Sequence, residues 1–201
     1  MKSIILDQYE VREVLEGRSL IVRLVRTKVP IHKDWKPHTI LDTTGRSKDI
    51  GKVCFQSDDV VMEEGKTRTE YFKLPYKVGQ KIWVKETFKE YNDWDFVYKF
   101  DGEDYSYPFM PWISPGIMPQ KASRITLEIV EVKVKRLDDM NSGELHLILK
   151  FALKEYPSLS LLYLRELFLS LWDEKYNKKG YGCETNPYVW LYEVNQIEVE
   201  K

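Results

Sequence analysis

The sequence predicts an α+β protein: a β-barrel with peripheral helices and an inserted region of loop and hairpin. Segments rich in β-branched and aromatic residues stand toward both ends of the chain, and two helical segments precede the last of them. A chain of 201 residues is long enough for one substantial core. We therefore expect a single domain over residues 1–201, with an insertion at about 30–70 and a helical insertion at about 141–176.

The first element is expected to be a short helix after Asp7. Glu10 follows Asp7 by three residues, which is the spacing of a capping box, and apolar residues at helical spacing come next. Gly17 is a natural C-terminal stop for this helix. The segment SLIVRLVRT at 19–27 is rich in β-branched residues, and we expect it to be a strand.

The region 30–70 has no long periodicity and is treated as an insertion on the core. The segments GKVCFQ (51–56) and RTEYFKL (68–74) have the composition of paired strands and predict a hairpin. Pro30 and Pro37 indicate loop elsewhere in the region.

Strands are expected next at 82–88 and, more briefly, at 96–100. The longest strands are expected at 124–135 and at 188–199. The apolar alternation of the third of these four changes phase at Ile129–Val130, which predicts a β-bulge of the kind that lets a long strand turn a barrel corner.

Two helices are expected between the last two strands. One runs roughly over 142–153, and Pro157 ends it. The other spans about 159–176 and is expected to have a wide apolar face. Its apolar residues are Leu161, Leu162, Leu164, Leu167, Phe168, Leu171 and Trp172.

The composition excludes several classes of protein. The net charge of −1 argues against a protein that coats nucleic acid non-specifically, although it leaves room for a local basic face. Cys54 and Cys183 are the only cysteines, which excludes a disulfide framework and suits a reducing compartment. The histidines lack metal-ligand spacing, so we expect no metal and no cofactor. No signal peptide or membrane-spanning stretch is recognised, and we expect a cytoplasmic protein.

Glu86 is the first candidate functional residue. In the strand 82–88, the side-chain period of two puts Ile82, Val84 and Glu86 on the same face. If this face is the barrel interior, the carboxyl group is expected to have a raised pKa or to pair with a cation. The alternative is that Glu86 lies at the strand end, where the barrel opens to water.

The second candidate is a local basic block that begins in the first long strand. Basic residues outnumber acidic ones from Arg18 to Lys36, where Asp34 is the only acid. Arg18, Ser19 and Arg23 open this block, which is of the kind that contacts phosphates. The alternative is a solvated strand edge guarded by charge.

The third candidate is the stretch PWISPGIMPQKASR at 111–124, where a proline-rich loop leads directly into a strand. Aromatic and methionine side chains next to arginine can sandwich a nucleobase. The alternative is that the aromatic and methionine residues cap the barrel as core. The candidate ligand contacts here are Trp112, Met118, Lys121, Ser123 and Arg124, together with Lys85 from the preceding strand.

With these residues in hand, the chain resembles the ASCH domain family of the PUA-like superfamily, in particular a longer phage-associated branch often labelled morphogenetic protein. Four blocks carry the resemblance and cover most of the chain outside roughly 30–70 and 141–165. They are Leu15-Glu16-Gly17-Arg18; Pro75-Tyr76, Gly79 and Trp83-Val84-Lys85-Glu86-Thr87; Trp112-Ile113-Ser114-Pro115, Met118-Pro119 and Ala122 to Glu128; and Leu171-Trp172, Gly180-Tyr181-Gly182 and Asn186 to Trp190.

The resemblance implies a small PUA-like β-barrel whose cleft accepts RNA or a modified nucleoside. One small enzyme of this family deacetylates acetylated cytidine with a lysine, a threonine and a glutamate. Here Ser19 stands at the lysine position and Val22 at the threonine position, and only the glutamate is kept, as Glu86. Valine cannot act as a nucleophile, and this departure from the family's pattern favours binding over catalysis.

We therefore expect an RNA-binding or modified-nucleotide-binding module. Arg23, Lys85, Lys121 and Arg124 would hold phosphates, and Trp112 would stack on a base. One alternative is a hydrolase, either a nucleoside amidohydrolase with an altered triad or a metal-assisted ribonuclease. A second alternative is a phage assembly or host-interaction protein, which would act on a protein partner in the host cytoplasm. No membrane partner is expected.

Overall fold

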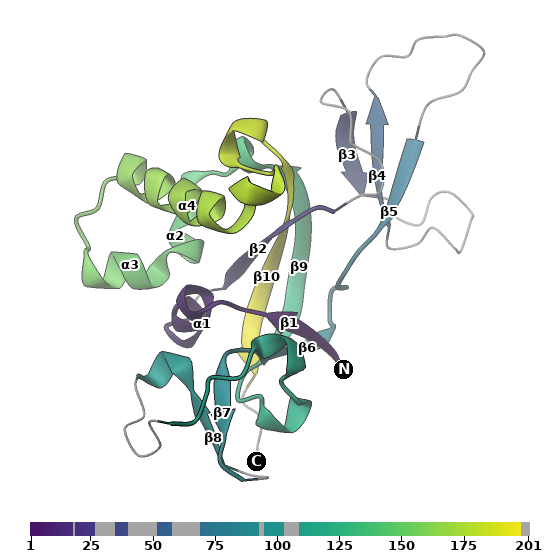
Figure 1. Ribbon diagram of the computed structural model, residues 1–201. Coiled ribbons are helices and arrows are strands. Elements are labelled where there is room, and N and C mark those ends of the chain that lie inside the picture. The colour runs from purple at the N-terminus through teal and green to yellow at the C-terminus, as the bar shows by residue number, and fades with distance from the viewer. Residues whose placement is uncertain are drawn as a thin grey trace.

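The computed structural model describes residues 1–17, 19–26, 35–39, 52–57, 69–92, 95–102 and 109–197. Its centre is a five-stranded mixed sheet (Figure 1). In spatial order the strands are β1 (Lys2–Ile5), β6 (Lys81–Lys85), β9 (Thr126–Arg136), β10 (Tyr188–Ile197) and β2 (Leu20–Leu24). The β1–β6 pair is parallel, and the other neighbours are antiparallel.

The predicted α+β class is confirmed, and strands within the predicted segments 19–27, 82–88, 124–135 and 188–199 belong to this one sheet. The strand predicted at 82–88 is shorter than expected, because it ends at Lys85 and Phe88 begins a strand of a smaller sheet. The predicted barrel is not confirmed. Among the residues that the structure describes, β1 and β2 remain at the two edges of the sheet, and no ladder joins them.

Residue alternation explains how the sheet separates two cores. On β2, Leu20, Val22 and Leu24 pack into a cluster shared with the helices. Ile21 and Val25 pack into a cluster on the other side, with residues of β6, β9 and β10. This division follows the period of two expected for a strand covered on both faces.

The bulge predicted in β9 is confirmed. Glu193 of β10 lies opposite Glu131, and Val194 lies opposite Ile129, so Val130 is an extra residue on β9. Val130 is 41% exposed, whereas Ile129 is buried. A bulge of this kind increases the local twist of the sheet.

The first helix is confirmed as α1 (Gln8–Leu15), with the predicted capping box between Asp7 and Glu10. Gly17 follows the helix with φ of +90°, a backbone conformation that other residues rarely adopt. The helix therefore begins and ends where its own sequence dictates.

The helices between β9 and β10 differ from expectation. The predicted helix over 142–153 is interrupted at Leu149, which separates α2 (Ser142–Ile148) from α3 (Lys150–Glu155). The Glu13 carboxylate of α1 accepts a hydrogen bond of 2.7 Å from the backbone N–H of Phe151. A distant side chain thus caps a new helix start, which no local sequence signal could indicate.

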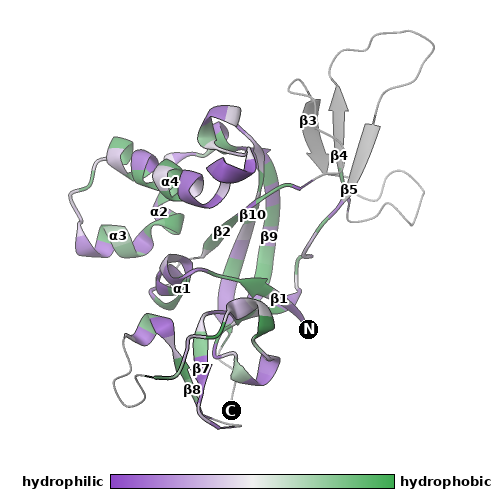
Figure 2. Cartoon of the chain, in the orientation of Figure 1, coloured by the Kyte–Doolittle hydropathy of each residue, from purple (hydrophilic) through white to green (hydrophobic). Residues whose placement is uncertain are grey.

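The last helix is α4 (Leu161–Tyr176). Leu164, Phe168, Trp172 and Tyr176 are buried, and Leu167, Leu169 and Leu171 pack beside them against the same cluster. The predicted wide apolar face is therefore present, but Leu161 and Leu162 do not belong to it, because they are 47% and 68% exposed. Figure 2 shows hydrophobic and hydrophilic residues along the same helices α2 to α4. None of the helices in the described ranges is long and apolar enough to cross a membrane.

Two smaller sheets flank the main one (Figure 1). The first, which we call the arm, consists of β3 (Trp35–Thr39), β4 (Lys52–Ser57) and β5 (Thr69–Lys73). The predicted hairpin is confirmed as the β4–β5 pair. The expectation of loop at Pro37 is wrong, because β3 is an edge strand and an edge position tolerates proline. The second sheet, the ribbon, pairs β7 (Phe88–Glu90) with β8 (Phe96–Tyr98).

Candidate functional site

The proline-rich loop at 111–124 is fixed to the ribbon. Ile113 N donates to Phe88 O at 2.7 Å, and Phe88 N donates to Ile113 O at 3.3 Å. The Tyr98 hydroxyl donates to Ala122 O at 2.7 Å. The loop and the ribbon share a small hydrophobic cluster that contains Trp83, Phe88, Tyr98, Met118 and Ala122. The loop is thus a preorganised wall rather than a loose connection.

Glu86 follows the end of β6 and is 3% exposed. Both of its oxygens accept hydrogen bonds from Arg124, one from Nε and one from a terminal nitrogen, each at 2.9 Å. Burial raises the pKa of Glu86 above its ordinary value, and the bonds from Arg124 oppose that rise. The sequence predicted either a raised pKa or a paired cation for Glu86, and the structure has both.

Arg124 has two further partners, Asp101 and the Tyr98 ring. Its other terminal nitrogen donates to both Asp101 oxygens, at 2.9 and 2.8 Å. Its guanidinium lies 4.0 Å from the centre of the Tyr98 ring. Burial alone would lower the pKa of Arg124, but the bonds to Glu86 and Asp101 more than offset this and raise it. The guanidinium is therefore permanently charged and already shared between two carboxylates.

Met118 and Ser123 form hydrogen bonds with the backbone next to the Glu86–Arg124 pair. Met118 is 2% exposed, and its sulfur accepts a hydrogen bond of 3.2 Å from the backbone N–H of Glu86. The Ser123 hydroxyl lies 2.8 Å from Val84 O and 3.1 Å from Ile125 O, and it donates to these carbonyls. Both candidate residues thus fix the loop to β6, and neither presents its polar group to solvent.

The lysines of this surface surround its aromatic rings. Lys89 Nζ lies 4.6 Å from the centre of the half-buried Trp112 ring. Lys85 Nζ donates to Gly116 O at 2.9 Å. Lys121 Nζ lies 3.4 Å from a Glu90 oxygen and 5.7 Å from the Phe96 ring centre. Lys89 was missed in the sequence, because its contact with Trp112 joins two segments more than twenty residues apart.

Three apolar side chains stand out on the same loop. Phe109 is 97% exposed, Ile117 is 75% exposed and Met110 is 37% exposed. Isolated exposed apolar residues are common on protein surfaces. Here they belong to the same loop as Trp112 and Lys121, and Lys85 bonds to this loop at Gly116 O, whereas Lys89 is buried. Aromatic and apolar side chains combined with lysines suit nucleobases and phosphates. We call this set of residues, 109–121 with Lys85 and Lys89, the loop surface.

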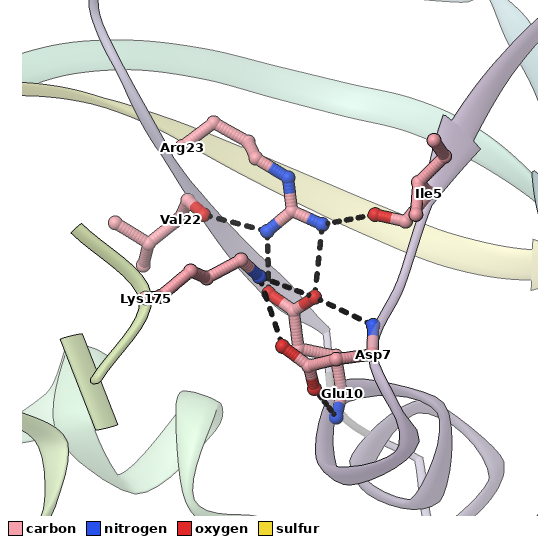
Figure 3. A network of polar contacts seen from close by, with 6 residues as sticks. All are labelled: Ile5, Asp7, Glu10, Val22, Arg23 and Lys175. Carbon is pink, nitrogen blue, oxygen red and sulfur yellow. Dashed lines mark hydrogen bonds and ion pairs between the residues drawn. The ribbon is translucent and has the colours of Figure 1, made fainter. Parts of the chain in front are cut away.

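Arg23 belongs to a different polar network, which Figure 3 shows. Its guanidinium donates to both oxygens of Glu10, to Val22 O at 2.8 Å and to Ile5 O at 2.8 Å. Lys175 of α4 donates to the carboxylates of Glu10 and Asp7, each at 2.9 Å. Arg23 therefore joins β2, α1 and the end of β1, and its donors are occupied by the protein itself.

The basic block has two other candidates, Arg18 and Ser19, and the structure describes only Ser19. The backbone carbonyl of Ser19 accepts a hydrogen bond of 2.7 Å from Val194 N. Arg18 lies outside the described residues. Arg23 and Arg124 belong to two separate networks, so the structure does not gather the predicted phosphate contacts into one site.

A pocket of about 500 Å³ adjoins the Arg23 network, between α1, β2, α4 and the α2–α3 junction. Its walls include Val22, Phe168 and Trp172, and its polar groups include Glu10 and Lys175. Glu86 does not line it. Of the three positions matched to the deacetylase residues, Val22 lines this pocket, and Ser19 and Glu86 do not.

No family model, curated protein or solved structure matches the chain. The geometry of its sites is therefore the basis for assigning a function.

Proposed function

We propose that the chain is a nucleic-acid-binding module that takes single-stranded RNA, or a modified nucleotide, on its loop surface. The observation that carries the proposal is that one short loop exposes Phe109 and Ile117 and also holds Trp112, whose ring has the Lys89 ammonium 4.6 Å from its centre. Aromatic and apolar faces interleaved with lysines suit the stacking of splayed bases and the neutralisation of their phosphates.

The roles in this proposal follow the contacts. Phe109 and Trp112 would stack on bases, and Lys85 and Lys121 would approach phosphates. Glu86 and Arg124 would set the shape of the loop instead of contacting the ligand, because each satisfies the other. This differs from the roles expected from the sequence, where Arg124 was assigned a phosphate and Glu86 a base edge.

The proposal includes the ASCH-type, PUA-like fold suggested by the resemblance. Arg23 supports it, since its bond to Ile5 O connects the two edge strands of the sheet, β2 and β1. The Arg23 side chain thus connects the two strands that would have to pair with each other to close a barrel. An experimental structure in which β1 and β2 lie far apart would contradict this part of the proposal.

The pocket beside Val22 favours a second candidate function, the binding of a free nucleoside or a similar small molecule. A volume of about 500 Å³ lies within the range typical of ligand pockets. Catalysis there would lack a nucleophile at Val22. A thermal-shift screen with free nucleosides, repeated with Val22→Trp to fill the pocket, would test this function apart from the loop surface.

The test of the proposed function is a binding titration with a labelled single-stranded RNA, followed by fluorescence anisotropy. Trp112→Ala should weaken binding by about 1–3 kcal/mol, the typical loss of one stacked base. Tyr163→Ala is a matched control, because Tyr163 is a 52% exposed aromatic residue of α4. Equal binding by the two folded variants would refute the assignment of RNA to the loop surface.

A further inference from the structure

We propose that the pocket beside Val22 binds an uncharged, planar aromatic molecule and excludes anionic molecules of the same shape, phosphorylated ones included. The inference rests on the second candidate function, the binding of a small molecule in this pocket, and it names the chemical class of that molecule. It does not depend on RNA binding by the loop surface, which involves other residues.

The walls of the pocket are apolar and largely aromatic. Phe168, Trp172 and Tyr176 line it, and all three are buried. They are spaced by four along α4, so their rings follow one another on one side of the helix. The ring centres of Phe168 and Trp172 are 6.4 Å apart, and those of Trp172 and Tyr176 are 4.3 Å apart. A planar aromatic ligand would add a further ring to this row, and contacts between rings stabilise a complex beyond the apolar area that they bury.

The polar side of the pocket is an ion-pair network without net charge, which Figure 3 shows. Its members are two carboxylates and two cations: Asp7, Glu10, Arg23 and Lys175. Lys175 Nζ lies 2.9 Å from an oxygen of Asp7 and 2.9 Å from an oxygen of Glu10. Arg23 donates to both oxygens of Glu10. Each charge of the network therefore has a partner of opposite sign within the protein.

This neutrality determines which ligand charge the pocket accepts. A charged group that enters an apolar pocket loses its water, and the cost is recovered only where an opposite charge is free to pair with it. Lys175 is already shared between Asp7 and Glu10, so it is not free to pair with a ligand phosphate or carboxylate. The other charged residue among those that line the pocket is Glu174, which is exposed and would repel an anion. An uncharged ligand avoids both costs.

The experiment titrates the isotope-labelled full chain with three probes and follows the chemical shifts by NMR. The probes share an indole ring and a two-carbon arm: tryptophol is uncharged, tryptamine is a cation and indole-3-propionate is an anion. Tryptophol should bind most tightly, and indole-3-propionate should bind about tenfold more weakly, because its carboxylate loses water without gaining a partner. The shifts should concentrate on α4 and on the first turn of α1, whose residues line the pocket.

Lys175→Gln tests the charge argument inside the pocket. Without this cation the network has one negative charge in excess, so tryptamine should bind about fivefold more tightly to the variant than to the wild type, the upper end for one exposed ion pair. Tryptophol should bind both proteins equally. Lys178→Gln is the matched control, because Lys178 is an exposed lysine just after α4 that does not line the pocket.

Tighter binding of tryptophol than of either charged probe, with the response of tryptamine confined to Lys175→Gln, supports the inference. Equal binding of the three probes, or tightest binding of a charged one, overturns it and leaves the pocket as a small-molecule site. An equal response of tryptamine to the two variants also overturns it. If Lys175→Gln fails to fold, the three probes on the wild type decide. If neither the probes nor free nucleosides shift the pocket residues, the second candidate function and this inference both fail, whereas RNA binding by the loop surface is measured separately with Trp112→Ala.

Discussion

Removing Arg124 should destabilise the fold through the carboxylate that it leaves behind. Glu86 is 3% exposed, and its two hydrogen bonds of 2.9 Å both come from Arg124. Leaving one partner of a buried ion pair alone typically costs about 3–5 kcal/mol. The lower end applies here, because Arg124 itself is 20% exposed and Asp101 is exposed to water. We therefore expect Arg124→Ala to lower the free energy of unfolding by about 3 kcal/mol near neutral pH.

The loss should depend on pH in a defined direction. Burial raises the pKa of Glu86 in the folded protein. A group with a raised folded pKa contributes stability that is present below its unfolded pKa and is lost as pH rises through the folded value. Removing Arg124 removes the hydrogen bonds that lower the pKa of Glu86, so the folded pKa rises further. The pH range over which this stability is lost then extends to higher pH. The variant should therefore lose more stability than the wild type between about pH 5 and pH 7.

Urea unfolding followed by tryptophan fluorescence at both pH values measures these free energies. Adding Glu86→Gln to Arg124→Ala should recover part of the stability at neutral pH and abolish the extra pH dependence. Arg165→Ala is the matched control, since Arg165 pairs with Asp138 at the surface and should contribute less than about 1 kcal/mol. A loss in Arg124→Ala no larger than in the control, or one independent of pH, would refute the reasoning.

Three further predictions concern other parts of the molecule. Phe168→Ala should lower the free energy of unfolding by about 3–5 kcal/mol, whereas Leu162→Ala should change it by less than about 0.5 kcal/mol; equal losses in urea unfolding would mean that Leu162 also packs against the protein. Gly17→Ala should destabilise by about 1–2 kcal/mol in thermal melts, because φ is +90° and the added Cβ would lie 3.1 Å from Lys150 Nζ. The chain should not hydrolyse acetylated cytidine, since Val22 offers no nucleophile; turnover in a chromatographic assay that Glu86→Gln abolishes would contradict this.

The sequence predicted the features that depend on neighbouring residues. The Asp7–Glu10 capping box sets the start of α1, and the change of alternation at Val130 locates the bulge, because both signals lie within a few residues. The interruption at Leu149 could not be predicted in this way. It depends on Glu13, which lies far away in the chain and supplies a hydrogen-bond acceptor to a buried helix start.

The candidate site was predicted only in part, because its central contact also joins residues that lie far apart in the sequence. The strand alternation indicated that Glu86 would be partly buried, but not that Arg124 would be its partner. Each was selected on its own chemistry, Glu86 for catalysis or hydrogen bonding and Arg124 for phosphate. Glu86 and Arg124 lie 38 positions apart and form an ion pair with each other, so neither keeps the role that its own chemistry suggested. Charge counts along a sequence do not show which charges are paired in the fold.

The two arginines of these networks and the lysines of the loop surface therefore have different roles. Arg23 and Arg124 use their planar guanidinium groups to hold carboxylates and carbonyls of the fold itself. The cations of the loop surface are lysines, which carry a point charge and lack the forked geometry that reads a guanine edge. If the loop surface binds nucleic acid, recognition should depend strongly on salt and little on base sequence. A strong sequence preference would instead require Arg124 to leave Glu86, at the energetic cost predicted for Arg124→Ala.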